Sequence, residues 1–163
     1  MRTLLTLLLA AGLLSACDPQ RVDKLEEGLA TEADVRKQFG EPAHTTEHAD
    51  GSKLLAYPRQ PEGWTNYEME IGADGKLNAL RQLLTPANFA KVQPGLGQAD
   101  VRRLLGRHAR ELRYATQPGQ TVWRWHVMQG QDKKVFDVVF GADGRVLSAA
   151  LADDERQTQP GGK

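Results

Sequence analysis

The stretch GLGQADVRRLLG, residues 95–106, decides how this chain is organised, because a close relative of it stands earlier, at residues 28–40. Both contain Ala-Asp-Val-Arg, which begins at Ala33 in the first stretch and at Ala99 in the second, an offset of 66 residues (99 − 33). Both also end in glycine. Repetition at a fixed distance indicates two copies of one small structural unit, and it has to be recognised before any fold is predicted.

The domain boundaries follow from a second repeated string, Gly-Ala-Asp-Gly, at residues 72–75 and again at 141–144. Such a string is typical of a turn between strands. We expect the first repeat to span residues 22–84 and the second residues 85–151, followed by a polar, disordered tail at residues 152–163. Each repeat has about sixty residues, a size at which a single core is marginally stable, so the two should pack together.

Each repeat begins with residues that favour helices. Thr31 and Asp34 have the spacing of a capping box, and Gly40 suits the position that ends a helix. In the second repeat, Thr85 followed by proline opens a first helix, and a second helix ends at Gly106. A short apolar turn before residue 28 supplies the partner helix of the first repeat. The sequence therefore predicts a helix-turn-helix pair in each repeat.

The rest of each repeat predicts strands. In one of them Tyr67, Met69 and Ile71 alternate with Glu68 and Glu70, as in a sheet with one face on a core and one in solvent. Four strands are expected in each repeat, at residues 44–48, 53–57, 64–71, 76–84, 110–116, 121–128, 133–140 and 145–151. The predicted fold class is α+β, with two tandem repeats, each a helix-turn-helix pair packed on a 3-4 stranded antiparallel sheet.

The N-terminus predicts export and lipidation. Arg2 precedes an apolar stretch at residues 4–14, and Leu-Ser-Ala-Cys at residues 14–17 resembles the lipobox of bacterial lipoproteins. We expect residues 1–16 to be a signal peptide, Cys17 to carry the lipid, and residues 17–21 to form a tether. The alternatives are a plain secretory signal that leaves a free thiol, or an N-terminal transmembrane anchor. An unpaired cysteine is a liability in an exported chain, and the apolar stretch is short for a spanning helix.

Composition excludes some classes of partner. The chain has 163 residues with 21 Lys and Arg against 21 Asp and Glu, so its net charge is zero. A nucleic-acid-binding domain usually has a basic footprint, and nothing of that kind is present in this sequence. No nucleic-acid partner is therefore expected.

The second repeat resembles a known lipoprotein family. Gly95-Leu96, Leu105-Gly106, Trp123-Arg124-Trp125 and the strand at residues 136–146 are similar to the SmpA/OmlA (BamE-like) domain. The tandem layout resembles that of the β-lactamase inhibitor protein. The first resemblance implies a β-barrel assembly complex as partner and the periplasmic face of the outer membrane as location. The inner membrane stays an alternative location, because Asp18, directly after the lipidated cysteine, resembles a retention signal for that membrane.

One catalytic string is present, His44-Thr45-Thr46-Glu47-His48, which matches the inverted zincin pattern. The motif needs a helix to bring its two histidines onto one zinc ion. Here it lies between turn residues, and along a strand the histidines would stand about 13 Å apart. The sequence predicts no metal, no cofactor and no enzyme activity.

Aromatic residues are the candidates for protein binding. Trp123 and Trp125 alternate with Arg124 and His126 along one expected strand. Large aromatics dominate core burial, but Trp and Arg are also enriched at binding hot spots. Both interpretations stay open here for this strand. The candidate protein-binding residues are Trp64, Tyr57, Trp123, Arg124, Trp125 and His126.

Together these features predict a membrane-anchored periplasmic lipoprotein. It would act as a non-enzymatic protein-interaction module, with a role in outer-membrane protein assembly or envelope integrity. The alternative is an inhibitor or ligand-binding lipoprotein that uses a concave sheet face.

Overall fold

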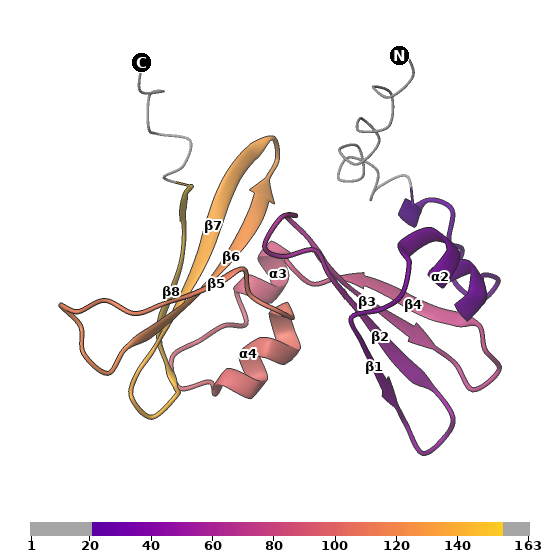
Figure 1. Cartoon of the computed structure of the whole chain (residues 1–163), viewed down its shortest axis with the longest axis horizontal. Coiled ribbons are helices and arrows are strands. Elements are labelled where there is room, and N and C mark those ends of the chain that lie inside the picture. The colour runs from indigo at the N-terminus through magenta and orange to yellow at the C-terminus, as the bar shows by residue number, and fades with distance from the viewer. Residues whose placement is uncertain (1–20, 155–163) are drawn as a thin grey trace, which may run out of the picture.

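The computed structural model describes residues 21–154, and it contains two antiparallel sheets of four strands each (Figure 1). Sheet 1 has the order β1-β2-β3-β4 and sheet 2 the order β5-β6-β7-β8. Each predicted strand segment overlaps one observed strand. The strands are β1 (His44–Glu47), β2 (Lys53–Pro58), β3 (Asn66–Ile71), β4 (Leu77–Gln82), β5 (Arg110–Leu112), β6 (Thr121–Gln129), β7 (Asp132–Phe140) and β8 (Val146–Asp153).

The predicted fold class is wrong in its helical half. The helices with defined bounds are α2 (Glu32–Phe39), α3 (Pro86–Phe89) and α4 (Gln98–Leu105). In the described part of the first repeat only residues 21 and 22 are helical before α2, and α3 has only four residues. A helix-turn-helix pair is therefore absent from residues 21–84. The apolar turn before residue 28 is too short to propagate a helix, because nucleation fixes several residues for one hydrogen bond.

The elements stack in layers. Figure 1 shows α3 and α4 between sheet 2 and sheet 1, with α2 on the far side of sheet 1. The two repeats pack together as expected, and the second repeat meets the first through its helices. One face of sheet 1 is therefore covered by its own helix, and the other is turned toward the second repeat.

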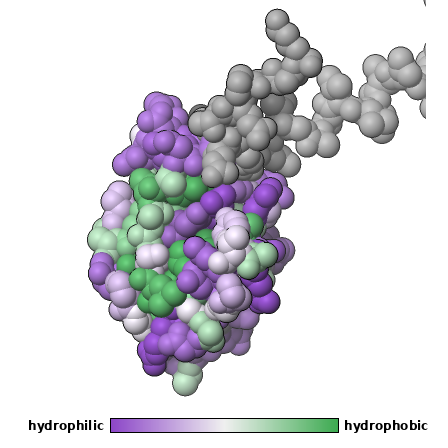
Figure 2. All heavy atoms as spheres, turned by 90° about the vertical axis from the view of Figure 1, so that its left-hand side faces the viewer, coloured by the Kyte–Doolittle hydropathy of each residue, from purple (hydrophilic) through white to green (hydrophobic). Residues whose placement is uncertain are grey.

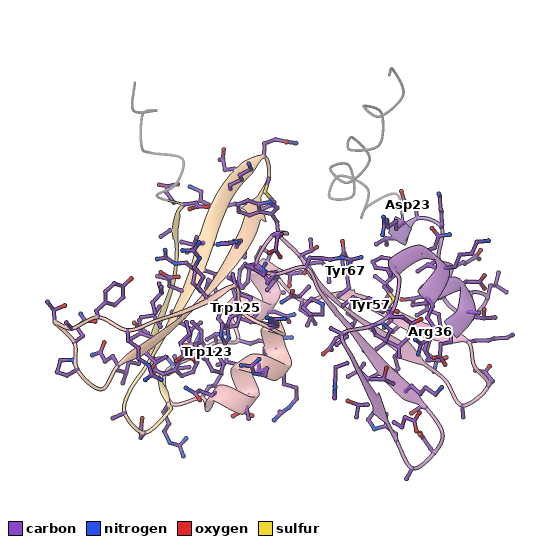
Figure 3. The ribbon with its side chains drawn as sticks, viewed as in Figure 1. Asp23, Arg36, Tyr57, Tyr67, Trp123 and Trp125 are labelled. Atoms are coloured by element: carbon purple, nitrogen blue, oxygen red, sulfur yellow. The ribbon has the colours of Figure 1, made fainter. Side chains whose placement is uncertain are left out.

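Each sheet packs its alternate residues against its own helix. In the first repeat Phe39 lies 5.5 Å from both Tyr57 and Tyr67, measured between ring centroids. In the second repeat Trp123 and Trp125 point toward α4, as Figure 3 shows, and both belong to the buried cluster there. The two cores are separate clusters, as expected for two copies of one unit.

The N-terminus and the end of the chain fall outside this description. The predicted signal peptide at residues 1–16, the lipidation site Cys17 and most of the tether lie outside the described residues, as do residues 155–163. The first two residues of the predicted tail belong to β8. Between residues 21 and 154, no helix has both the length and the apolar character needed to cross a membrane.

Candidate functional site

A groove of about 370 Å³ lies between the open face of sheet 1 and the end of α4. Its walls come from both repeats, and we call it the inter-repeat groove. It is lined by Ala43, His44, Ala56, Pro58, Asn66, Tyr67, Glu68, Leu83, Arg102, Gly106 and Arg107. Because the two repeats build it jointly, its shape depends on how they are held together.

Asn66 lines this groove and links the two repeats through hydrogen bonds. Its side-chain amide donates to the carbonyl oxygens of Leu105, at 2.7 Å, and Arg107, at 2.8 Å. Its oxygen accepts from the backbone N–H of Arg59 at 3.2 Å, and only 1% of the residue is exposed. Carbonyls at a helix end have no partner within the helix. One buried amide of the first repeat therefore closes the last turn of α4 in the second.

The loop between β2 and β3, residues 59–65, makes the second link. The side-chain amide of Gln60 donates to the carbonyl of His126 at 2.8 Å and accepts from its N–H at 3.1 Å. The His126 Nδ1 lies 2.7 Å from the carbonyl of Pro61. The short strand β5 pairs with β6 only as far as Arg124, so the side chain of Gln60 takes the place of the missing neighbour strand.

Glu68 lines the groove in an environment that is unfavourable for its negative charge. Burial raises the pKa of this carboxyl, and Arg81 opposes the change only in part. Among the described residues its carboxylate has no hydrogen bond. Removing a carboxylate from water without a compensating donor is unfavourable. The groove therefore holds a half-buried acid whose hydrogen-bonding capacity is unused.

The matching position in the second repeat is arranged differently. Glu68 corresponds to Asp137, because Ile71 and Phe140 stand at the same place in their sheets. The cross-strand neighbour of Asp137 is Arg124, which donates two hydrogen bonds to it at 2.7 and 2.6 Å. The cross-strand neighbours of Glu68 are Ala56 on β2 and Arg81 on β4, and the guanidinium of Arg81 donates to Glu70 at 3.1 Å instead. The carboxylate that is neutralised in one repeat is thus left without a donor in the other.

The opposite wall is basic. Arg102 and Arg107 are both exposed, and neither has a carboxylate within ion-pair distance in the part of the chain that the structure describes. The guanidinium of Arg102 lies over the ring of Trp123, 4.7 Å from its centroid. A ligand in the groove would meet an acid on the sheet and two guanidinium groups on the helix side.

The two tryptophans of β6 are core residues. Trp125 is fully buried and Trp123 is 5% exposed, with its Nε1 donating to Glu111 at 3.2 Å. The ring of His108 stacks on Trp123 at 4.5 Å, and burial lowers the pKa of this histidine. Of the two interpretations that the sequence leaves open, core burial and an exposed binding surface, the first describes these tryptophans. Neither is placed to meet a partner directly.

The other candidate binding residues are scattered. Tyr57 is buried under α2, where its hydroxyl donates to the Gly40 carbonyl at 3.1 Å and desolvation raises its pKa to about 12. Trp64 is half-buried in the β2–β3 loop, 5.5 Å from the ring of His126. His126 is 3% exposed, and Arg124 is paired with its aspartate as described above. The structure does not gather the six into one surface.

The zincin-like string lies in and just after β1, so the helix that its chemistry requires is absent there. His44 is exposed and lines the inter-repeat groove, while Glu47 and His48 follow at the end of the strand. Across residues 21–154 there is no group of three or more His, Cys, Asp or Glu side chains that could hold a metal ion.

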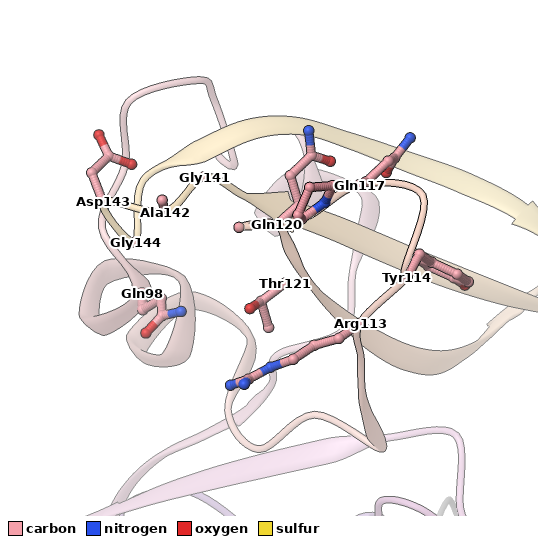
Figure 4. A pocket seen from close by; sticks show the side chains of 12 residues that line it. Gln98, Arg113, Tyr114, Gln117, Gln120, Thr121, Gly141, Ala142, Asp143 and Gly144 are labelled. Carbon is pink, nitrogen blue, oxygen red and sulfur yellow. The ribbon is translucent and has the colours of Figure 1, made fainter.

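A second hollow, of about 610 Å³, lies between the β5–β6 loop and the β7–β8 turn. In Figure 4 the long side chain of Arg113 extends toward Gln98, and Tyr114 lies at the opposite end. Its charged groups already have partners, since Arg113 pairs with Glu111 at 2.9 Å and Asp143 accepts from the N–H of Arg145 at 3.0 Å. The inter-repeat groove is the better candidate site because its charges are unpaired.

Sequence reasoning did not single out the residues that build this groove. The alternation predicts Glu68 only as a solvated acid, Asn66, Gln60 and Arg107 belong to no motif, and Arg102 belongs to the repeated helical string, which predicts structure and no site. A signal did exist, because aligning the two repeats through their strands places Ala56 against Arg124. In the first repeat the arginine next to this acid lies on the other neighbouring strand, as Arg81, and it pairs with Glu70.

Comparison with known proteins gives no family. No protein-family model matches the chain, and no curated protein matches it. A DUF4309 family protein, YjgB, from Bacillus subtilis is 18% identical, with 83% of this chain and 86% of that chain covered and a TM-score of 0.35. An extracellular protein containing an SCP domain from Bacillus anthracis is 12% identical, with 84% and 47% covered and a TM-score of 0.31.

These comparisons overturn the family prediction. No family model matches the chain, that of the SmpA/OmlA family included, so the resemblance read from the second repeat is wrong. Its motifs were short glycine and aromatic strings around turns and strands. Such strings arise wherever a capped helix precedes an antiparallel sheet, and they carry little family information.

Proposed function

We propose that this chain is a lipid-anchored envelope protein that binds another protein in the inter-repeat groove without catalysing a reaction. The anchor is the lipobox cysteine, Cys17. The narrower expectation of a role in outer-membrane assembly depended on the SmpA/OmlA resemblance, so the proposal does not include it. The proposal concerns only the class of activity and the surface that performs it.

The observation that carries the proposal is the carboxylate of Glu68. It is half-buried, its pKa is raised by burial, and no described residue donates to it. Positions that retain an unfavourable polar group in the free protein are typical of functional sites, where a ligand supplies the missing partner. An N–H donor or a cationic side chain of a bound polypeptide would do so here.

The shape and charges of the groove fit an extended polypeptide. The floor contributes apolar surface from Ala56, Pro58 and Leu83, while Glu68 and Arg107 supply opposite charges. Binding sites commonly combine an apolar lining with a few polar groups that fix orientation. A segment with a basic residue facing the sheet and an acidic residue facing α4 would satisfy both walls.

In-cell photo-crosslinking tests this proposal. A photoreactive amino acid replaces Ala43, which is exposed at the groove, and a control chain carries it at Ala142, which is exposed at the second hollow. We expect one defined envelope protein to be cross-linked from Ala43 and not from Ala142. A soluble enzyme as the adduct would favour an inhibitor instead, and equal adducts from both positions would refute the groove as the site.

A further inference from the structure

The outer edge of β8 differs from every other described strand edge in this fold. An edge strand exposes unpaired N–H and C=O groups, and proteins usually shorten, charge or cover it. The edge strand β1 has four polar residues, β5 has three residues, and the uncovered part of β6 is occupied by Gln60. β8 has eight residues, VLSAALAD, with neither lysine, arginine nor proline.

The equivalent edge in the first repeat, that of β4, is covered at Leu77 and at Leu80. Gly28 donates to the Leu77 carbonyl at 2.7 Å, and the Leu77 N–H donates to Ala30 at 2.8 Å. Further along β4, the Leu80 N–H donates to the carboxylate of Glu27 at 2.7 Å. The segment before α2 thus closes the edge of sheet 1.

The second repeat keeps only the first part of this cover. Gly95 donates to the Val146 carbonyl and the Val146 N–H donates to Leu96, both at 2.8 Å. The residue that corresponds to Glu27 is Pro94, one position before the matching glycine, and its side chain cannot accept a hydrogen bond. Beyond Val146 the edge has no such cover within the described residues.

Alternation along the strand shows which groups this edge presents. Leu80 in the first repeat turns its N–H outward, and Ala149 holds the same place in β8. Successive residues alternate between the two sides of a strand, so Leu151 and Asp153 also turn their N–H and C=O groups outward. Leu151 is 39% exposed, although it is apolar. The edge therefore offers a row of unused hydrogen-bonding groups flanked by apolar side chains.

We propose that two molecules of this chain dimerise by antiparallel pairing of β8 with β8, which joins their second sheets into one sheet of eight strands. Outward-facing residues pair with outward-facing residues, and the two-fold axis is placed at Leu151, the middle one of Ala149, Leu151 and Asp153. This register sets Leu151 against its counterpart and Ala149 against Asp153, and no like charges stand opposite each other. The two copies of Asp153 would be about 13 Å apart along the strands, and each is already paired with Lys134.

The side chains of β8 are compatible with this pairing register. Ser148, Ala150 and Ala152 are small and exposed on the face of sheet 2 that is turned away from α4. Figure 2 shows that side of the molecule, where hydrophobic residues gather in the middle among hydrophilic ones. Pairing through main-chain bonds needs no groove and no charge on the partner. A second molecule with the same edge, whose one charge at Asp153 is already paired with Lys134, is therefore a matched occupant.

Cysteine cross-linking of the full chain tests this register. At Leu151→Cys the two sulfurs would face each other across the axis, with Cα atoms about 5.5 Å apart. At Ser148→Cys the two sites would be about 20 Å apart. Under mild oxidation we expect about tenfold more disulfide-linked dimer from Leu151→Cys than from Ser148→Cys, with the unsubstituted chain measuring any contribution of Cys17. Equal yields, or no dimer from Leu151→Cys, would overturn the proposal.

A proline variant separates pairing from folding. The N–H of Leu151 points outward, so Leu151→Pro removes no bond within the sheet but blocks a partner strand. Leu151→Ala keeps the N–H and serves as the matched control. We expect light scattering of the detergent-solubilised full chain to give a monomer for Leu151→Pro and a dimer for Leu151→Ala and the unsubstituted chain. A monomeric unsubstituted chain, or a dimer of Leu151→Pro, would refute pairing through β8.

Discussion

The two repeats share a capped helix that ends in glycine, yet the surroundings of the two helix ends differ. In the first repeat a Cβ on Gly40 would meet no atom within 4 Å. In the second repeat a Cβ on Gly106 would approach Asn66 Nδ2 to 3.1 Å and Leu83 Cδ1 to 3.2 Å. The same local sequence ends a helix within its own repeat in the first copy and forms a contact between repeats in the second.

The connection between the two central strands diverges as well. In the second repeat only Gly130 and Gln131 separate β6 from β7, whereas residues 59–65 separate β2 from β3. The longer loop carries Gln60, which reaches the edge of β6. The shared elements therefore make the two cores, whereas the hydrogen bonds between the repeats come from Gln60 and Asn66, which have no counterpart in the second repeat.

The largest expected effect is at Asn66. Asn66→Ala leaves the buried carbonyl of Leu105 and the partly buried carbonyl of Arg107 without this donor, which should lower the free energy of unfolding by about 3 kcal/mol. Urea unfolding measures this change. Asn78→Ala, at an exposed position in the same sheet, is the control and should stay close to the unsubstituted chain. Equal effects of the two substitutions would mean that the contact between repeats contributes little.

The glycine pair gives a matched comparison. Both residues have positive φ, 80° at Gly40 and 70° at Gly106, so alanine is strained at either. Gly40→Ala should therefore cost about 1 kcal/mol. Gly106→Ala should cost about 2 to 3 kcal/mol, because the methyl group also displaces Asn66 or Leu83. Urea unfolding of the two variants side by side checks this order, and the reverse order would contradict the packing of the second helix end.

A smaller, pH-dependent effect is expected at Glu68. Burial raises the pKa of its carboxyl in the folded state above the ordinary value of 4.5, so the folded state favours the proton. Stability from this group is present below the unfolded pKa and is lost as pH rises through the folded pKa. Glu68→Gln should thus equal the parent in acid and be slightly more stable at neutral pH.

Unfolding at pH 3.5, 5 and 7 measures that difference. Asp137→Asn is the matched control, because Asp137 already has a guanidinium partner in Arg124. That substitution should destabilise the chain at neutral pH, since it breaks a charge-assisted pair. If Glu68→Gln were equally destabilising at neutral pH, the carboxylate would have a partner in the free chain and the comparison of the two repeats would fail.

The strands and the capped helices were predictable because their signals are local. Thr31 and Asp34 form the expected capping box, and in the second repeat Asp100 still accepts from the N–H of Gly97 at 3.3 Å. The turn before residue 28 was overestimated, since two apolar residues at helical spacing do not make a helix. Family membership was predicted wrongly from strings that local structure alone explains.

The groove was harder to predict because it depends on contacts across 39 to 66 residues of sequence, such as Asn66 with Leu105 and Gln60 with His126. A lone asparagine or glutamine has no pattern that indicates a distant backbone partner. The interpretation of Trp123 and Trp125 as an exposed binding surface was wrong for a related reason. Alternation shows that two residues share a face of a sheet, but it does not tell which face the helix covers.

The most direct test of the account is the photo-crosslink from Ala43 in chains whose Glu68 is neutralised in two independent ways. Glu68→Gln removes the charge, and Ala56→Arg supplies the cross-strand guanidinium that Arg124 gives Asp137 in the second repeat. Both variants should fold at least as stably as the parent, yet the adduct should fall about tenfold, as expected when a buried charged partner is lost. An unchanged adduct in both would contradict the claim that the unpaired carboxylate of the first repeat is the binding determinant.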